Sequence, residues 1–200
     1  YQDRAYARRY TELVARMRRV ESTLLPDGIQ FSEAVARGYF KLLAYKDEYE
    51  IARLYTDPEF ARALSSVFEG PFKLRYHLAI PVLSRPDPAA GEPTKRRYGP
   101  WLASAFQLLA PLKFLRGTPF DLFGYGAERR LERSLIRQYE ATLDAILPAL
   151  RPDTLALAAE IARLPEGIRG YGPIKERSVA AARKRRAELM EEIKDARTRR

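Results

Sequence analysis

The stretch AERRLERSLIRQYEATLDAIL, residues 127–147, carries the clearest helical pattern in the chain. Apolar residues recur in it every three or four positions and continue to Leu150, while charged residues such as Glu132 and Arg137 fill the positions between them. Because an α-helix has about 3.6 residues per turn, this spacing places the apolar side chains on one face. The apolar set is Leu131, Leu135, Tyr139, Leu143, Ile146 and Leu150. The stretch therefore predicts an amphipathic helix packed against a core.

Proline, glycine and capping residues divide the rest of the chain into further helices. Asp57-Pro58 is typical of a helix start, a cap followed by proline at the first helical position. Pro111 and Pro165 are expected to end or kink the helices that reach them. The further predicted helices span residues 2–21, 32–55, 58–70, 100–111, 153–164 and 173–200. The sequence predicts a mainly α fold.

One short region changes its period from helical to alternating. From residue 72 to residue 80, apolar side chains occupy every second position, which indicates a strand. A turn-rich loop follows at residues 86–93, and residues 95–98 can return as a second short strand. With no internal repeat and no long linker, we predict a single helical domain over residues 1–200, with at most one small β-hairpin.

Composition excludes several kinds of chemistry. The 200 residues contain no cysteine, which excludes disulfides, cysteine nucleophiles and thiolate ligands for zinc or iron–sulfur clusters. The only histidine is His77, which we interpret as structural or exposed, so we predict no metal site. No apolar run approaches the roughly 18 residues of a membrane span. We expect a fragment of a longer cytoplasmic polypeptide, because the sequence starts at Tyr1 inside a helical pattern.

The chain is strongly basic, with a formal net charge of +10. The predicted last helix carries many of the arginines and lysines, which could contact the phosphates of a nucleic acid. The same residues also alternate with glutamates at helical pair spacing, such as Lys184 and Glu188, which is typical of a solvated helix. No known nucleic-acid motif accompanies the charge. We therefore favour the solvated helix and treat a basic nucleic-acid-binding module as the alternative.

Two residues are weak candidates for binding an anion. Arg169 and Lys175 flank the glycine-rich turn at residues 167–173, just where the last helix begins, and a helix start favours negative ligands. The loop at residues 121–126 also precedes a helix, but it lacks the preceding strand and the Gly-Lys-Ser/Thr ending of a phosphate loop. No pair of carboxylates is spaced for acid–base work, so we predict no catalytic residue.

Asp47 interrupts the apolar face of the helix predicted over residues 32–55. Phe40, Leu43, Ile51 and Leu54 share that face with it. A lone buried carboxylate is costly, so it must take up a proton or find a partner. We expect Asp47 to be buried and bonded to a basic side chain or to N–H groups at a helix start, as a structural pin. Arg129, Arg133 and His77 are among the possible partners.

Six blocks of the sequence carry a family resemblance. They read FKLLAYKDEYEIARLYT (40–56), HLAIP (77–81), KRRYGPW (95–101), LRGTPFDLFG (115–124), ERRLERSLIRQYE (128–140) and LPEGIRGYGPIKE (164–176). In this order they resemble the C-terminal region of indolepyruvate ferredoxin oxidoreductases, the large single-chain members of the 2-oxoacid:ferredoxin oxidoreductase family. The resemblance covers nearly the whole chain.

The resemblance implies a function for the whole enzyme more than for this region. Family members oxidatively decarboxylate aryl 2-oxoacids to acyl-CoA with thiamine diphosphate, iron–sulfur clusters, coenzyme A and ferredoxin. The resemblance implies that the residues for this chemistry lie in other domains, so no cofactor is expected here. We expect a non-catalytic accessory domain that packs against the catalytic domains of the same polypeptide or across a subunit interface in a homo-oligomer. The alternative within the enzyme is a lid that contributes Arg169 or Lys175 to coenzyme A binding.

Overall fold

The computed structural model of the chain describes residues 1–78 and 96–198, which are mainly α-helical with one two-stranded hairpin. This confirms the predicted fold class. Part of the predicted strand (residues 79–80), the loop at 86–93, Lys95 and the last two residues lie outside the described residues. The contacts divide the chain into two compact units, which are described separately; that residues 1–200 form one domain stays a prediction.

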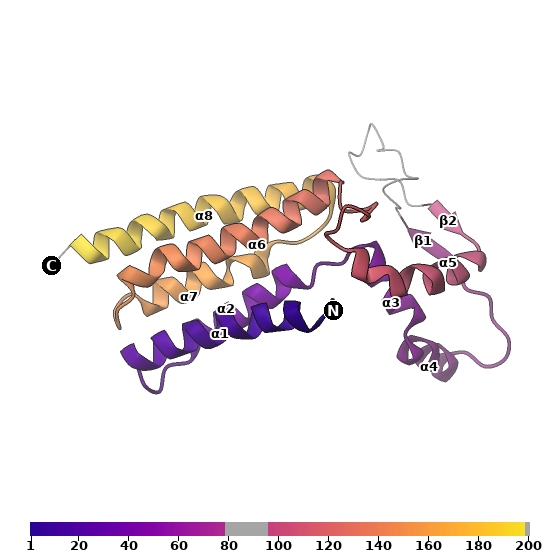
Figure 1. The fold of residues 1–200 in the computed structure, drawn as a ribbon, viewed down its shortest axis with the longest axis horizontal. Coiled ribbons are helices and arrows are strands. Elements are labelled where there is room, and N and C mark those ends of the chain that lie inside the picture. Colours follow the sequence, from indigo (N-terminus) through magenta and orange to yellow (C-terminus); the bar gives the residue numbers. More distant parts are fainter. Residues whose placement is uncertain (79–95, 199–200) are drawn as a thin grey trace. The chain divides into compact units, whose positions relative to one another are not determined.

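The bundle unit comprises residues 2–45 and 130–200. Its helices run alongside one another, with α2 against both α1 and α7, and α7 against α8 (Figure 1). Prolines at residues 148 and 165 begin short 3-10 turns where the preceding helices end. The elements are α1 (Arg4–Leu24), α2 (Gln30–Leu43), α6 (Ala127–Ile146), η2 (Leu147–Ala149), α7 (Leu155–Arg163), η3 (Leu164–Gly167) and α8 (Gly172–Thr198). The first three residues of α6 belong to the other unit.

The core of the bundle unit is continuous and apolar. Leucine, isoleucine, alanine and tyrosine side chains from all five helices form one buried cluster. Leu135, Tyr139 and Leu143, from the amphipathic stretch that predicted α6, belong to this cluster. Gly38 lets α2 approach α7 closely, since a Cβ there would lie 2.3 Å from the carbonyl oxygen of Ala162.

The hairpin unit comprises Tyr1 and residues 46–129. Its strands pair antiparallel, with Tyr76 opposite Tyr98 and His77 opposite Arg97. Its apolar core is a small cluster around Tyr76 and Phe106, with Tyr55 stacked on Phe106. The elements are α3 (Glu48–Thr56), α4 (Pro58–Val67), β1 (Tyr76–Leu78), β2 (Arg96–Tyr98), α5 (Trp101–Leu109) and the 3-10 helix η1 (Ala110–Leu115).

The prediction of one long helix over residues 32–55 is wrong. The helix ends at Leu43 and a new one, α3, begins at Glu48. Asp47 is extended, with φ −93° and ψ −179°, and its carboxylate accepts a hydrogen bond from the N–H of Glu50. Aspartate favours such a capping position over a helix interior, because its short side chain satisfies a free N–H group of the first turn.

Other boundaries also differ from the prediction. The helix α4 ends at Val67 instead of near residue 70, and the described strand β1 starts at Tyr76 although alternation begins at residue 72. Alternation alone is not sufficient for a strand, which also needs a partner for its backbone groups. Among the described residues, no helix combines the length and apolar character that crossing a membrane requires.

Candidate functional site

Asp47 lies at the centre of the polar contacts of the hairpin unit. The residue is 2% exposed, and one oxygen of its side chain accepts the N–H of Glu50 at 2.8 Å. Arg116 donates to both carboxylate oxygens, through Nη2 at 2.9 Å and through Nε. The guanidinium carbon of Arg116 also lies 4.2 Å from the centre of the Tyr1 ring. The burial and pairing of Asp47 are as the sequence predicts, but the observed partner, Arg116, was not among the residues singled out.

Two of the basic residues considered for Asp47 are in different settings. Arg129 is buried and its Nε lies 3.5 Å from a carboxylate oxygen of Glu48, the first residue of α3. Burial raises the pKa of Glu48, while the positive charge of Arg129 opposes that rise. His77 is exposed on β1. The start of α3 therefore holds two neighbouring carboxylates, with Asp47 paired to Arg116 and Glu48 close to Arg129.

Asp121 fixes the loop between η1 and α6. It is buried and accepts hydrogen bonds from the N–H groups of Gly117 at 2.8 Å and Gly124 at 3.0 Å, and from the hydroxyl of Tyr49 at 3.2 Å. Burial, together with the charge of Asp121, raises the pKa of Tyr49 to about 12. The glycines of this loop thus bind an internal carboxylate.

Three large side chains of the same loop point outward, while Phe123 packs against the ring of Tyr49. Phe120 is 74% exposed and Leu122 is 82% exposed. Tyr125 is exposed as well, although its hydroxyl donates to the carbonyl of Pro119 at 2.8 Å. In this part of the loop a carboxylate is buried and large apolar side chains are exposed, which is the reverse of the usual preference of these residue types. Such a fixed apolar projection is typical of a contact surface.

Arg169 and Lys175 lie in the bundle unit in different settings. Lys175 forms an ion pair with Glu132, and both side chains are largely buried. Arg169 is exposed, and its backbone N–H and carbonyl both bond to the hydroxyl of Ser178. Of the two, Arg169 is therefore the side chain open to a ligand.

The structure adds a third cation to this region, which the sequence did not indicate. Lys41 on α2 donates through Nζ to the carbonyl of Glu166 at 2.5 Å. Burial lowers the pKa of Lys41, and the positive charges of Arg169 and Lys175 lower it further. Lys41 lies 125 residues from Glu166, so no local pattern could have placed it there.

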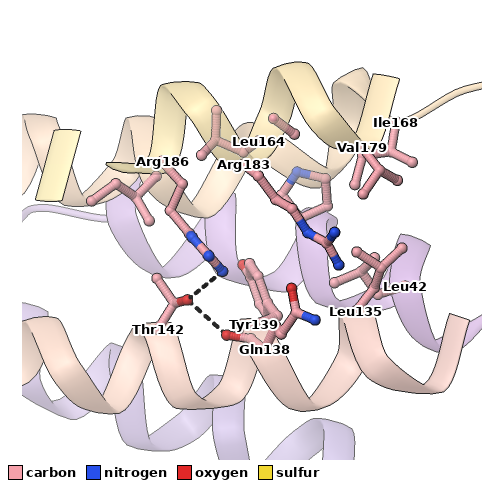
Figure 2. Close-up of a pocket in the computed structure, with 13 residues that line it drawn as sticks. Leu42, Leu135, Gln138, Tyr139, Thr142, Leu164, Ile168, Val179, Arg183 and Arg186 are labelled. Atoms are coloured by element: carbon pink, nitrogen blue, oxygen red, sulfur yellow. Dashed lines mark hydrogen bonds between the residues drawn. The ribbon is translucent and has the colours of Figure 1, made fainter. Parts of the chain in front are cut away.

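A cavity of about 50 Å³ lies between α6, α8 and the segment around η3 in the bundle unit. Its walls are mostly aliphatic, and Arg183 and Arg186 from α8 lie at one side (Figure 2). Arg186 donates to the hydroxyl of Thr142 at 3.4 Å, which is a weak bond. The amide of Gln138 lies between the two guanidinium groups in this view. The apolar lining comprises Leu42, Leu135, Tyr139, Ile161, Leu164, Pro165, Ile168, Val179 and Ala182.

Among the described residues, no cluster of histidine, aspartate and glutamate side chains is arranged to hold a metal ion. No curated protein and no solved structure matches the chain significantly. The model of a family of unknown function, DUF6537, matches residues 1–188. Since this match covers nearly the whole chain, the protein belongs to the DUF6537 family of unknown function.

Proposed function

We propose that this chain is a non-catalytic accessory domain of an indolepyruvate-type ferredoxin oxidoreductase, a cytoplasmic enzyme. In that enzyme the other domains would hold thiamine diphosphate and the iron–sulfur clusters, bind coenzyme A and pass electrons to ferredoxin. The role of this chain would be to pack against those catalytic domains or across a homo-oligomer interface. The proposal starts from the six sequence blocks that resemble the C-terminal region of such enzymes.

The observation that carries the proposal is the loop at residues 117–126. Asp121 holds its backbone from inside, and Phe120 and Leu122 project outward. Ordering a loop before binding lowers the entropy lost on association, so exposed aromatic and aliphatic side chains on a fixed loop are good anchors for a protein partner. The block LRGTPFDLFG contains residues 117–124 of this loop, including Phe120 and Leu122, which links the contact surface to the resemblance.

The polar residues of the resembling blocks support a structural role. Asp47 and Arg116 bind each other, Lys175 binds Glu132, and Asp121 binds backbone groups. Groups engaged in this way maintain the fold and are not placed to move a proton on a substrate. Because these polar groups are engaged within the fold, binding through the apolar loop is the function that the geometry supports best.

The test uses the full-length polypeptide that contains this chain. We expect it to contain thiamine diphosphate and to reduce ferredoxin when given indolepyruvate. The double variant Phe120→Ser, Leu122→Ser should keep the rate per bound thiamine diphosphate, but it should inactivate at a lower temperature and release this domain faster under limited proteolysis. Val67→Ser, an equally exposed apolar site on α4, is the matched control and should change neither property.

Two results would contradict the proposal. A full-length protein with no thiamine diphosphate and no 2-oxoacid-dependent electron transfer would remove the enzyme assignment. A fall in the rate per bound thiamine diphosphate in the loop variant, with unchanged thermal stability, would mean that the loop takes part in turnover instead of packing.

The cluster of Lys41, Arg169 and Lys175 favours one second candidate function. Three cations near the start of α8 could attract the phosphates of coenzyme A if this domain closes over an active site. Replacing Arg169 and Lys175 with alanine should then raise the apparent constant of the full-length enzyme for coenzyme A, without changing that for the 2-oxoacid. An unchanged constant for coenzyme A would leave the turn with a structural role only.

Nucleic acid remains the less favoured partner. On α8, Arg185 binds Glu160 at 2.7 Å and also contacts Glu188 and Glu192, while Lys194 binds Glu191 at 2.7 Å. Cations engaged in such pairs are less available to neutralise phosphates. We expect any binding of RNA or DNA to be weak, independent of sequence and lost as salt is raised.

A further inference from the structure

The cavity between α6 and α8 combines two surfaces with different chemistry. Its walls are aliphatic, with Leu42, Leu135 and Val179 among them, and all three side chains belong to the buried core of the bundle unit. Its polar side carries Arg183 and Arg186. Ligand sites in helical bundles have this composition, an apolar lining with a few polar groups that fix orientation.

The polar side of the cavity has an excess of hydrogen-bond donors. Arg183 and Arg186 are three residues apart on α8, so their side chains leave the same face of the helix. Figure 2 shows both guanidinium groups directed towards α6, with the amide of Gln138 between them in that view. Among the described residues that line the cavity, none is acidic. The charge of this side is therefore positive and is not neutralised within the lining.

Neither arginine has a strong partner within the described part of the chain. The bond from Arg186 to Thr142 is long, at 3.4 Å, and the same hydroxyl donates to the carbonyl of Gln138 at 2.7 Å. No side chain in the described residues accepts a hydrogen bond from Arg183. By contrast, Arg185, one residue before Arg186, is held by Glu160. Two guanidinium groups beside an apolar cavity match a carboxylate with an apolar tail, because arginine binds carboxylates with paired hydrogen bonds.

The size of the cavity limits the tail. A site for one water molecule needs roughly 10–15 Å³, so a cavity of about 50 Å³ has room for a few groups of that size. Sites for drug-sized ligands typically measure roughly 300–1,000 Å³, so a small ligand suits this cavity better. A short branched tail of three or four carbons suits this space.

We propose that the cavity binds a short branched aliphatic carboxylate, with the tail among Leu42, Leu135 and Val179 and the carboxylate on Arg183 and Arg186. The proposal does not depend on the function proposed above for the domain. It assigns a binding role to arginines of α8 that would otherwise be counted only as part of its basic surface.

The probe for this site is isovalerate, titrated into the full chain labelled with ¹³C at its leucine and valine methyl groups. We expect saturable shifts of the methyl resonances of Leu42, Leu135 and Val179. Acetate has the charge without the tail, and isoamyl alcohol has the tail without the charge. Both should bind at least about tenfold more weakly than isovalerate, because each lacks one of the two interactions.

Three variants locate the site. Arg183→Gln should weaken the binding of isovalerate about tenfold or more, since it removes a charge-assisted hydrogen bond. Ala182→Leu should abolish binding by filling the cavity, with little loss of helix propensity. Arg177→Gln is the matched control, an exposed arginine on the same helix that does not line the cavity, and it should leave the affinity unchanged. Thermal melting of each variant reports whether the fold is intact.

The proposal is overturned by any of three outcomes. Isovalerate could produce no saturable shift at the three methyl groups. Isoamyl alcohol could bind as tightly as isovalerate, which would make the cavity purely apolar. Arg177→Gln could weaken binding as much as Arg183→Gln does, which would mean that only the overall positive charge of α8 attracts the anion.

Discussion

The bundle unit and the hairpin unit are stabilised in different ways. The bundle unit has one apolar core drawn from five helices, and several of its ion pairs, such as Arg16–Asp144 at 2.5 Å, lie in partly exposed positions. In the hairpin unit the apolar core is small, and the ion pair between Asp47 and Arg116 is buried, with side chains 3% and 4% exposed. The hairpin unit also exposes many of the large apolar side chains, including Trp101, Leu108 and Phe114.

The difference shows what a small core requires. A small unit buries a smaller fraction of its surface, so each specific contact carries a larger share of its stability. A buried ion pair gives little net stability by itself, but losing one partner is costly because the other charge stays buried. We therefore expect polar substitutions to decide the stability of the hairpin unit, and changes of volume to decide that of the bundle unit.

The largest expected effect is in the hairpin unit. Asp47→Ala should destabilise it by roughly 3–5 kcal/mol, because Arg116 is left buried without its carboxylate and α3 loses its cap. Differential scanning calorimetry should show the melting of the hairpin unit lowered and that of the bundle unit nearly unchanged. The double variant Asp47→Leu, Arg116→Met removes both charges and should recover part of the loss. If the single variant Asp47→Ala is as stable as the parent, the hairpin unit does not depend on this ion pair, which would contradict the comparison.

A smaller effect is expected from added volume in the bundle unit. Gly38→Ala places a Cβ 2.3 Å from the carbonyl oxygen of Ala162 and 3.0 Å from the hydroxyl of Tyr139, so α2 and α7 must separate. Overpacking of this kind costs about 1–3 kcal/mol. Urea denaturation followed by circular dichroism measures the change. The matched control is Gly167→Ala, where a Cβ meets no described atom within 4 Å and the stability should hardly change.

The loop at residues 117–126 of the hairpin unit should become less stable when Asp121 loses its charge. Asp121→Asn keeps the shape of the side chain but replaces one acceptor oxygen with a donor, and both carboxylate oxygens accept backbone N–H groups. We expect a cost of about 1–2 kcal/mol for the hairpin unit, with faster hydrogen exchange at the N–H groups of Gly117 and Gly124. Exchange that is unchanged at both glycines would mean that Asp121 does not hold the loop.

The smallest effect concerns alkaline pH. The pKa of Tyr49 is raised to about 12, first by burial and then by Asp121, above the ordinary value of 10.0. The unfolded tyrosine therefore ionises first, so the contribution of Tyr49 to stability is complete below pH 10 and is lost as pH rises from 10 through about 12. The ultraviolet titration of the parent minus that of Tyr49→Phe should show a phenolate appearing near pH 12. In Asp121→Asn it should appear at lower pH.

Local sequence patterns were sufficient for much of the fold. The apolar spacing of residues 127–147 predicted α6, and the cap-and-proline pair at Asp57-Pro58 predicted the start of α4. Both signals come from residues within one or two turns of each other, and the physics of such neighbours does not depend on the rest of the chain. The exclusion of cysteine chemistry needed only the composition.

The tertiary structure decided which distant residues meet. Asp47 looked like an interruption of one long helix, but it caps a new helix and binds Arg116, 69 residues away. Lys41 meets the turn after α7, and Leu42 meets Arg183 at one cavity, although none of these pairs is close in sequence. Periodicity reports only which side chains share a face of one element. Which faces meet depends on how all the elements pack together, because the free energy of burying a charge or filling a cavity belongs to the whole core.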